Sequence, residues 1–340
     1  MAIKSVSLHE FGVFTDLKLD FCDGINVLIG ANGTGKTHLL KVLYALHAFV
    51  ERAEAPDSWE GKLNRVFRPD HIGRLVHRRV GVHSAKVACV IGGGHIDFSI
   101  TTRGKFEAVL RAATIGAPCL FIPSREVLST YEGFASLYKN REVAFDETYY
   151  DLCVALGLPA LRGPRGEKAA KLIKPIESAL GGKVVLEGQR FYVKGRDGDF
   201  EAHLVSEGFR KIAMLARLIT NGALAQKGVL FWDEPEANLN PQLARVLIDF
   251  LSHLAQQQVQ IFLATHDTLV AQRLSLISEY GSKPSVRFIG LFRNEGGEIH
   301  ADSGAALSDL QHNPLLEEFT RFHEDESKYF ADSIKGKVRT

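Results

Sequence analysis

The stretch that decides the fold is "GINVLIGANGTGKTHLLKVLYALHAFV", residues 24–50. It begins with a short apolar run, Ile25 to Ile29, which has the length and composition of a buried strand. The octapeptide "GANGTGKT" follows and matches the pattern GxxxxGK[ST] in full. Apolar residues then recur at helical spacing from Leu39 to Val50. The order strand, glycine loop and helix is the context in which this pattern binds phosphate.

The eight residues of this loop have defined expected parts in holding a nucleotide. The glycines let backbone N–H groups point into one concavity at a helix N-terminus, where phosphate oxygens bind. Lys36 is expected to reach the β and γ phosphates, and the Thr37 hydroxyl is expected to ligate Mg²⁺. A chance glycine-rich turn is the alternative, but its position between a strand and a helix argues against it. The predicted nucleotide-binding residues of the loop are Gly30, Ala31, Asn32, Gly33, Thr34, Gly35, Lys36 and Thr37.

A second stretch, "VLFWDE" at residues 229–234, places two acids directly after an apolar strand. Asp233 is expected in the Mg²⁺ shell, and Glu234 is expected to orient and polarise the water that attacks the γ-phosphate. The alternative is that the two acids cap the next helix, since Pro235 follows.

A third apolar strand, "IFLAT", ends at His266 and Asp267. If this strand lies beside the strand of Asp233, the His266 imidazole would reach the γ-phosphate as a hydrogen-bonding group. A lone histidine is more often structural or exposed, and the chain has thirteen histidines. The position of the strand is therefore what favours a catalytic role for His266.

The pattern of apolar runs predicts the organisation of the rest of the chain. Strands and helices alternate after the glycine loop, which indicates a mainly parallel sheet covered on both faces, with ligands at the carboxyl ends of its strands. "IKSVSLHEFGVFTDLKLDF" predicts a strand pair, and Asp197-Gly198 predicts a hairpin turn. Four segments are expected: an N-terminal lobe at 1–125, a helical insertion or lid at 126–182, a C-terminal lobe at 183–300 and a helical tail at 301–340.

The composition is that of a soluble globular protein, with 45% hydrophobic and 24% charged residues. Lys and Arg number 41 and Asp and Glu number 40, so any nucleic-acid contact would need a local basic patch. Four cysteines without CxxC spacing predict reduced thiols in a cytoplasmic protein. The chain has no apolar run approaching about eighteen residues, so neither a membrane span nor a standard signal peptide is expected.

Taken together, these motifs resemble the ABC-type ATPase heads of the SMC, RecF and OLD group, which include AAA family ATPases of prokaryotic DNA-maintenance and phage-defence systems. The resemblance extends over most of the chain. It implies an α/β fold of the P-loop NTPase class: an ABC/SMC-like head with a mainly parallel sheet, an antiparallel β subdomain and an inserted helical lid. It also implies that ATP and Mg²⁺ are the cofactors and that the protein hydrolyses ATP to ADP and phosphate.

The segment "VSEGFRK", residues 205–211, resembles the signature motif of this group. The resemblance implies that Ser206 and Gly208 contact ATP held by a second copy, so that a homodimer encloses two ATP molecules. Its chemical basis would be a hydroxyl and a backbone N–H at a helix N-terminus, which favours anions. A higher oligomer is left open. The alternative for Ser206 is an ordinary helix N-cap.

The sequence departs from the family pattern in three places. Glu207 stands where many signatures have glycine, and Asn240 stands where the following loop usually has aspartate. A glutamine loop is missing after the first lobe, and Arg125 or Glu126 in "FIPSRE" could approach the metal or the phosphates, unless this is a solvated turn. Two aromatic residues are candidates for stacking on adenine and equally for the core: Phe11 and Phe14.

Two further segments are candidates for contacts with partners. Residues 61–86 are locally basic, which indicates either a solvated face or a contact with DNA phosphates through Arg74, Arg78 and Arg79. The tail carries an apolar stripe for its own domain or for a partner. The stripe consists of Leu315, Leu316, Phe319 and Phe322.

Three functions are compatible with the sequence. The resemblance implies a conformational switch in a DNA-related or anti-phage system, with a separate nuclease or toxin as effector. The first alternative is a slow-turnover regulatory scaffold that holds such a partner without touching DNA. A transporter ATPase subunit is less favoured, because the signature and the missing glutamine loop fit it poorly.

Overall fold

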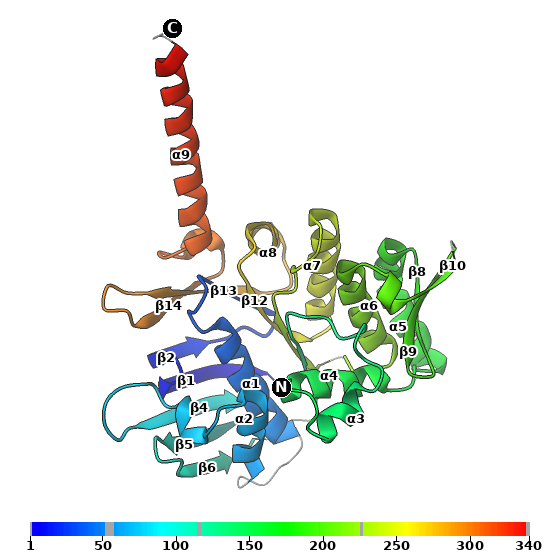
Figure 1. Ribbon diagram of the computed structural model, residues 1–340, viewed down its shortest axis with the longest axis horizontal. Helices are drawn as coiled ribbons and strands as arrows, with labels where there is room; N and C mark the ends of the chain where they lie inside the picture. Colours follow the sequence, from blue (N-terminus) through cyan, green and yellow to red (C-terminus); the bar gives the residue numbers. More distant parts are fainter. Residues whose placement is uncertain (1, 52–57, 114–116, 197, 225–226, 338–340) are drawn as a thin grey trace.

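The structure is a computed structural model that describes residues 2–51, 58–113, 117–196, 198–224 and 227–337. At its centre lies a six-stranded sheet in the order β14-β13-β3-β12-β11-β7 (Figure 1). The strands from β13 to β7 run parallel, and β14 pairs antiparallel at one edge. The strands are β3 (Ile25–Gly30), β7 (Cys119–Ile122), β11 (Val229–Asp233), β12 (Gln260–Thr265), β13 (Val286–Arg293) and β14 (Ile299–Gly304).

A five-stranded antiparallel sheet in the order β2-β1-β4-β5-β6 forms the second layer of the N-terminal part (Figure 1). The predicted strand pair is confirmed, since β1 and β2 pair antiparallel and their last ladder contact joins Phe11 to Phe14. The strands are β1 (Ile3–Phe11), β2 (Phe14–Asp20), β4 (Ser84–Ile91), β5 (Gly94–Thr101) and β6 (Phe106–Arg111).

Helices pack on both faces of the central sheet. α1 begins directly after the glycine loop and lies between the two sheets, whereas α6, α7 and α8 contribute to the core on the other face. The helices are α1 (Lys36–Glu51), α2 (Trp59–Phe67), α3 (Phe134–Lys139), α4 (Glu147–Gly157), α5 (Gly163–Leu180), α6 (Glu207–Thr220), α7 (Pro241–Gln256), α8 (Thr268–Tyr280) and α9 (Pro314–Lys337).

Neighbouring residues of β3 enter different cores, because side chains alternate across a strand. Leu28 belongs to the core shared with α1 and the antiparallel sheet, whereas Val27 and Ile29 belong to the core under α6 and α7. All three side chains are fully buried. Burial on both faces explains why these strands read as continuous apolar runs, and the predicted mainly parallel sheet covered on both faces is confirmed.

The region between β7 and α6 contains α3, α4 and α5, as the helical reading of residues 126–182 predicts. Their apolar residues, among them Leu152 and Ile173, join the core under α6 and α7. A three-stranded antiparallel sheet follows, formed by β8 (Gly182–Glu187), β9 (Arg190–Gly195) and β10 (Gly198–Glu201). The predicted turn at Asp197-Gly198 falls partly outside the described residues, since Asp197 is not among them.

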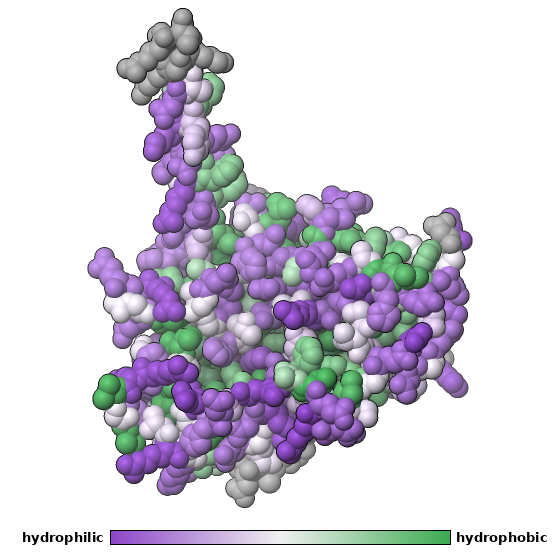
Figure 2. Space-filling view, in the orientation of Figure 1, coloured by the Kyte–Doolittle hydropathy of each residue, from purple (hydrophilic) through white to green (hydrophobic). Residues whose placement is uncertain are grey.

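The C-terminal helix α9 extends away from the body of the molecule (Figure 1). Three residues of its predicted apolar stripe are largely exposed: Leu316, Phe319 and Phe322. The space-filling view shows mostly hydrophilic side chains on the projecting helix, with some hydrophobic ones among them (Figure 2). The interpretation that the stripe packs onto its own domain therefore holds only for the base of the helix, where Leu315 is half-buried and contacts the core. Within the described ranges, no helix has the length and apolar character needed to cross a membrane.

Candidate nucleotide-binding site

The glycine loop connects the end of β3 to the start of α1, as predicted. Gly35 has φ +93°, a left-handed conformation that side chains rarely adopt, and a Cβ there would lie 2.5 Å from the Phe14 ring. A Cβ on Gly30 would lie 2.5 Å from the carbonyl oxygen of Leu291 in β13. Both glycines are therefore required by the packing around the loop as well as by its expected ligand.

Lys36 lies inside the loop and is only 8% exposed. Its Nζ donates to the carbonyl oxygens of Gly30 at 2.7 Å and Ala31 at 3.0 Å. Burial lowers the pKa of Lys36, and the carboxylates of Asp233 and Glu234 partly oppose this shift. Because these hydrogen-bond acceptors are neutral carbonyls, a phosphate group would be a stronger partner for the ammonium group.

Thr37 and Asp233 meet directly, although 196 residues separate them in sequence. The Thr37 Oγ1 donates to Asp233 Oδ2 at 2.8 Å. Burial raises the pKa of Asp233, and the hydrogen bond from Thr37 partly opposes this shift. A hydroxyl and a carboxylate oxygen in contact fit Mg²⁺, which binds hard oxygen ligands and keeps several waters.

Glu234 and His266 lie on neighbouring strand ends. β11 and β12 are parallel with Asp233 opposite Ala264, so both strands deliver these residues to the same edge. His266 Nδ1 lies 3.5 Å from Glu234 Oε1, and both side chains are partly exposed. Glu234 adopts φ +50°, and its N–H donates to Ala264 O at 2.8 Å. The strand of His266 therefore lies beside the strand of Asp233, as the prediction for His266 requires.

The alternative that the two acids cap a helix is wrong for α7. Residues after Glu234 form turns, and α7 begins six residues beyond Pro235, at Pro241. Its N-cap is Asn240, whose side chain accepts from Leu243 N at 2.9 Å. Asn240, which departs from the family pattern, thus has a structural use in its own chain.

Ser206 is the N-cap residue of α6, yet its side chain makes no capping hydrogen bond within the described part of the chain. The residue is exposed. Gly208, in contrast, is buried: a Cβ there would lie 2.5 Å from Asn238 O in the turn that follows β11. We expected Gly208 to offer an exposed backbone N–H, but its missing side chain makes room for this turn of its own chain.

Lys211 is a site residue that its sequence context did not identify. This residue is fully buried, and its Nζ donates to Glu234 O at 2.8 Å and Ala237 O at 3.1 Å. Burial lowers its pKa to about 8. The sequence did contain a signal for the burial of Lys211, because this residue stands on the buried stripe of α6 with Gly208, Ile212 and Leu215. A lysine at such a position needs specific partners.

The two residues proposed for the loop after β7, Arg125 and Glu126, differ in exposure. Glu126 is buried and accepts from Arg210 Nε at 2.7 Å, which ties it to α6. Arg125 is exposed and lines a cavity of about 490 Å³ together with Glu207 and Glu234. Both residues line this cavity, Arg125 as an exposed side chain and Glu126 as a buried one, so a fully solvated turn is wrong for Glu126.

Three other residues near the glycine loop are Phe11, Phe14 and Arg293. Phe11 and Phe14 are 1% and 0% exposed, so both belong to the core and neither presents a face to adenine. Arg293, which sequence analysis did not single out, donates from Nη2 to Gly33 O at 2.9 Å. It reaches the glycine loop from the end of β13, whose pairing with β3 could not be read from a local motif.

The basic segment does not form one solvated face. Lys62 is fully buried, whereas Arg74, Arg78 and Arg79 line an open cavity of about 510 Å³. Arg79 also pairs with Glu10 at 3.1 Å. This cavity lies beside the β1–β2 hairpin, where His77 Nδ1 is 3.0 Å from Gly12 O.

Two comparisons by sequence bear on this arrangement. Residues 104–271 match the family described as "AAA domain, putative AbiEii toxin, Type IV TA system", and residues 1–68 match the "AAA ATPase domain" family. The DNA replication and repair protein RecF of Pediococcus pentosaceus is 40% identical over 70 residues, and that of Limosilactobacillus fermentum is 37% identical over 70 residues. Each match spans 19% of this chain and 19% of the relative.

Solved structures with a similar fold include SMC heads. The SMC head bound to the C-winged helix domain of ScpA has a TM-score of 0.57 at 15% identity, and the match covers 89% of this chain and 98% of that one. The SMC head domain from Thermotoga maritima has a TM-score of 0.51 at 13% identity, with the same two coverages. The families matched, the RecF relatives and this fold together support an SMC/RecF-like ABC-type ATPase head.

Proposed function

We propose that this chain binds and hydrolyses Mg-ATP, and that two copies enclose two ATP molecules. The observation that carries the ATPase proposal is the contact between Thr37 and Asp233 at the sheet edge that also holds Lys36, Glu234 and His266. It brings two separate motifs together around one point. Thr37 and Asp233 would hold Mg²⁺, which would screen the phosphate charge and polarise the bond to be cleaved.

The remaining residues of this edge supply positioning and proton handling. Lys36 would exchange its two carbonyl acceptors for phosphate oxygens, because a charge-assisted hydrogen bond is stronger than a neutral one. Glu234 would orient the attacking water and accept its proton. His266, 3.5 Å away, would hold the Glu234 carboxylate in place or donate to the γ-phosphate.

The dimer proposal rests on Ser206 and on its connection to the site of its own chain. Ser206 is exposed at the start of α6, and its hydroxyl is not used as a cap within the described residues. One turn further along α6, Lys211 holds the backbone of Glu234 and Ala237. Binding of Ser206 to the ATP of a second copy would thus be transmitted to the turn that carries the first copy's Glu234.

The substitution Ser206→Arg tests this proposal. Arginine at this exposed position would block the approach of a second copy without touching Lys36 or Thr37. We expect ATP binding by the monomer to be retained and hydrolysis to be lost. The matched control is Ser282→Arg, an exposed serine that precedes β13, at the opposite end of the sheet. If Ser206→Arg still hydrolyses ATP, Ser206 only begins a helix and does not contact the ATP of a second copy.

We further propose that the ATPase acts as a conformational switch in DNA maintenance or anti-phage defence, with a separate nuclease or toxin as its effector. The names of the RecF relatives and of the matched AbiEii-type family support this role. Contact with DNA would use the cavity around Arg74 and Arg78, since Arg79 already pairs with Glu10.

DNA stimulation of ATP hydrolysis tests this contact. Arg74→Glu with Arg78→Glu should abolish stimulation by duplex DNA, and stimulation of the unaltered chain should fall with salt, because phosphate contacts release counterions. The control reverses two exposed lysines of α5, Lys168 and Lys171. Equal stimulation of both variants would remove this cavity as the DNA site.

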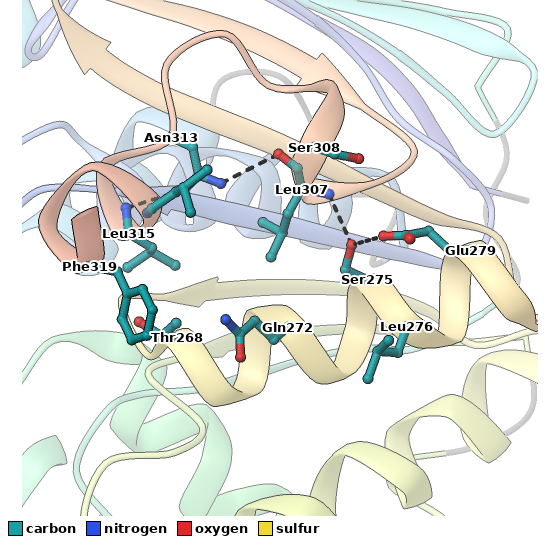
Figure 3. Close-up of a pocket in the computed structure, with 11 residues that line it drawn as sticks. Thr268, Gln272, Ser275, Leu276, Glu279, Leu307, Ser308, Asn313, Leu315 and Phe319 are labelled. Carbon is teal, nitrogen blue, oxygen red and sulfur yellow. Dashed lines mark hydrogen bonds between the residues drawn. The ribbon is translucent and has the colours of Figure 1, made fainter. Parts of the chain in front are cut away.

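The regulatory scaffold is the second candidate function, and the exposed stripe of α9 favours it. A groove of about 360 Å³ runs between α8 and the base of α9, with Leu276, Leu315 and Phe319 among its lining residues (Figure 3). Substituting Leu316, Phe319 and Phe322 by serine should leave hydrolysis unchanged and remove binding of a co-expressed effector. Loss of hydrolysis would instead assign α9 to the ATPase cycle.

A further inference from the structure

A second cluster of ligand-type side chains lies at the far end of α1. His47 is fully buried there, and neither of its ring nitrogens has a hydrogen-bond partner among the residues that the structure describes. Burial lowers the pKa of His47 to about 4, so the imidazole is neutral at pH 7. A buried polar group without a partner is costly, which points to a ligand for His47.

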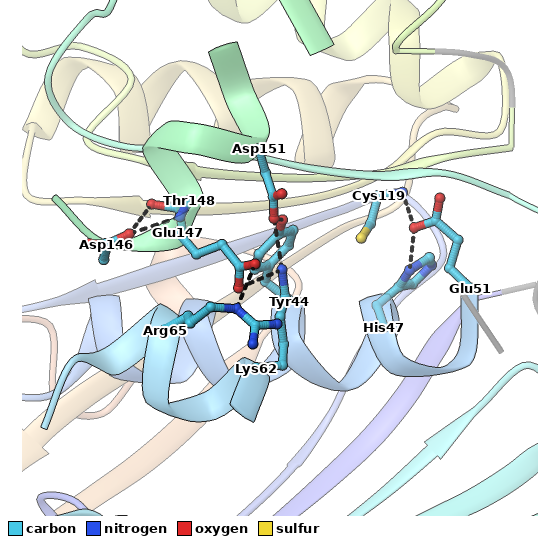
Figure 4. A network of polar contacts seen from close by, with 10 residues as sticks. All are labelled: Tyr44, His47, Glu51, Lys62, Arg65, Cys119, Asp146, Glu147, Thr148 and Asp151. Carbon is cyan, nitrogen blue, oxygen red and sulfur yellow. Dashed lines mark hydrogen bonds and ion pairs between the residues drawn. The ribbon is translucent and has the colours of Figure 1, made fainter. Parts of the chain in front are cut away.

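Two other ligand-type groups face this histidine. Glu51 stands one turn further along α1, and Cys119 is the first residue of β7. One ligand atom from each of the three residues lies within 4.8 Å of the others, and His47 Nδ1 is 3.9 Å from Glu51 Oε2. The Cys119 N–H donates to Glu51 Oε2 at 3.1 Å and fixes the carboxylate (Figure 4).

The chemistry of the three donors selects among metals. Imidazole nitrogen, thiolate sulfur and carboxylate oxygen are the ligands of Zn²⁺, whereas Mg²⁺ and Ca²⁺ prefer oxygen alone. Ligand atoms around a tetrahedral Zn²⁺ lie about 3.3–3.8 Å apart, given metal–ligand distances of about 2.0–2.3 Å. The 3.9 Å between His47 and Glu51 is close to this spacing, whereas separations of up to 4.8 Å would have to contract by roughly 1 Å or slightly more on binding.

We propose that His47, Glu51 and Cys119 form a site for Zn²⁺ or a similar transition metal, with a water as the fourth ligand. The Cys119 thiol would lose its proton on binding, and that proton would pass to solvent. Glu51 is 27% exposed and gives the ion a path from solvent. The buried His47 would gain the partner that it otherwise lacks.

The site would act on the fold and not on ATP chemistry. His47 is eleven residues along α1 from Lys36, which corresponds to about 16 Å at 1.5 Å per residue. Cys119 pairs with Val229, the first residue of the strand that carries Asp233. The ion would therefore tie the helix that follows the glycine loop to the edge strand beside β11.

Titration of the full chain with Co²⁺, after removal of metal by chelation, tests the proposal. We expect one Co²⁺ per chain with a thiolate-to-cobalt charge-transfer band that Zn²⁺ displaces. Cys119→Ser should abolish the band and weaken Co²⁺ binding by about tenfold or more. Cys22→Ser is the matched control, because Cys22 is also a half-buried cysteine but lies elsewhere. A missing band, or one that survives Cys119→Ser, would overturn the site.

A second measurement guards against a variant that fails to fold. Glu51→Gln alters a partly exposed side chain, so the fold should persist, and Co²⁺ should bind about tenfold more weakly. Zn²⁺ should raise the thermal midpoint of the unaltered chain, because an ion that binds only the folded state stabilises it, and this rise should shrink in Glu51→Gln. ATP affinity should not change. Equal Co²⁺ affinity in both chains would contradict the proposal.

Discussion

Buried lysines serve two regions of this molecule in different ways. At the candidate ATP site, Lys36 and Lys211 donate to backbone carbonyls, and burial lowers the pKa of both. Between α2 and α4, the fully buried Lys62 instead lies 2.7 Å from Asp151 and 3.2 Å from Glu147 (Figure 4). At the candidate ATP site, the hydrogen bonds of the two lysines go to carbonyl oxygens. Between α2 and α4, two carboxylates neutralise the charge of Lys62 directly.

This difference agrees with the binding role proposed for the first region and with a structural role for the second. An ammonium group whose hydrogen bonds go to neutral carbonyl oxygens can exchange them for stronger bonds to an anionic ligand, as a nucleotide site requires. The contact between α2 and α4 has its own counterions, and Lys41 of α1 adds a 2.7 Å ion pair with Asp146. Helices α1 and α2 thus hold the inserted helices through charges that need no ligand.

The largest effect is expected from breaking the balanced region. Lys62→Met would leave the buried Glu147 and the half-buried Asp151 without their shared cation, and loss of one partner of a buried ion pair costs about 3–5 kcal/mol. The free energy of unfolding in urea measures this. Lys4→Met is the control, since Lys4 and Asp23 form an exposed pair whose loss should cost less than about 1 kcal/mol. Equal losses in the two variants would end the distinction between the regions.

At the site itself, Lys36→Ala should leave the fold intact and slow hydrolysis. Loss of one pre-positioned charge donor reduces turnover by about 10²- to 10³-fold. The measurement is single-turnover hydrolysis of ATP, with the unfolding free energy as the control. Full activity, or a stability loss as large as that of Lys62→Met, would show that Lys36 is a structural lysine.

The smallest effect concerns the pH dependence of stability through Lys211. Its pKa is lowered from 10.5 in the unfolded chain to about 8 in the folded one. Between these values the unfolded chain holds a proton that the folded chain has released, so stability rises with pH. Below pH 8 both states are charged and the contribution is constant.

A comparison of unfolding free energies between pH 8 and 9.5 measures this contribution. The unaltered chain should gain up to roughly 1.4 kcal/mol per pH unit relative to Lys211→Met. Lys171→Met, at an exposed position of α5, should follow the unaltered chain. Parallel curves for Lys211→Met and the unaltered chain would refute the effect of burial on Lys211.

Sequence could predict the parts of the site that lie in short contiguous motifs. The glycine loop, Asp233, Glu234 and His266 each follow an apolar strand, and parallel pairing brings such strand ends to one edge. The order of the strands, with β12 between β3 and β11, then places His266 beside Glu234. For these residues the local pattern and the tertiary rule lead to the same position.

Contacts between distant residues could not be predicted. Lys62 meets Asp151 across 89 positions, so its place in a basic run concealed a buried ion pair. Gly208 was expected to offer its backbone N–H to a ligand, because only the structure reveals the turn at Asn238 that fills the space of its missing side chain. Helix α2 and Arg293 were missed for the same reason: packing against remote elements decides their roles.

The most direct test of the ATP-enclosed dimer is the molar mass of Glu234→Gln measured by light scattering, with and without Mg-ATP. This substitution should allow ATP binding and stop hydrolysis, so the closed state should accumulate. We predict about twice the 37.5 kDa chain mass with Mg-ATP, the monomer mass without it, and the monomer mass in both conditions when Ser206→Arg is added. A monomer of Glu234→Gln in both conditions would contradict the account.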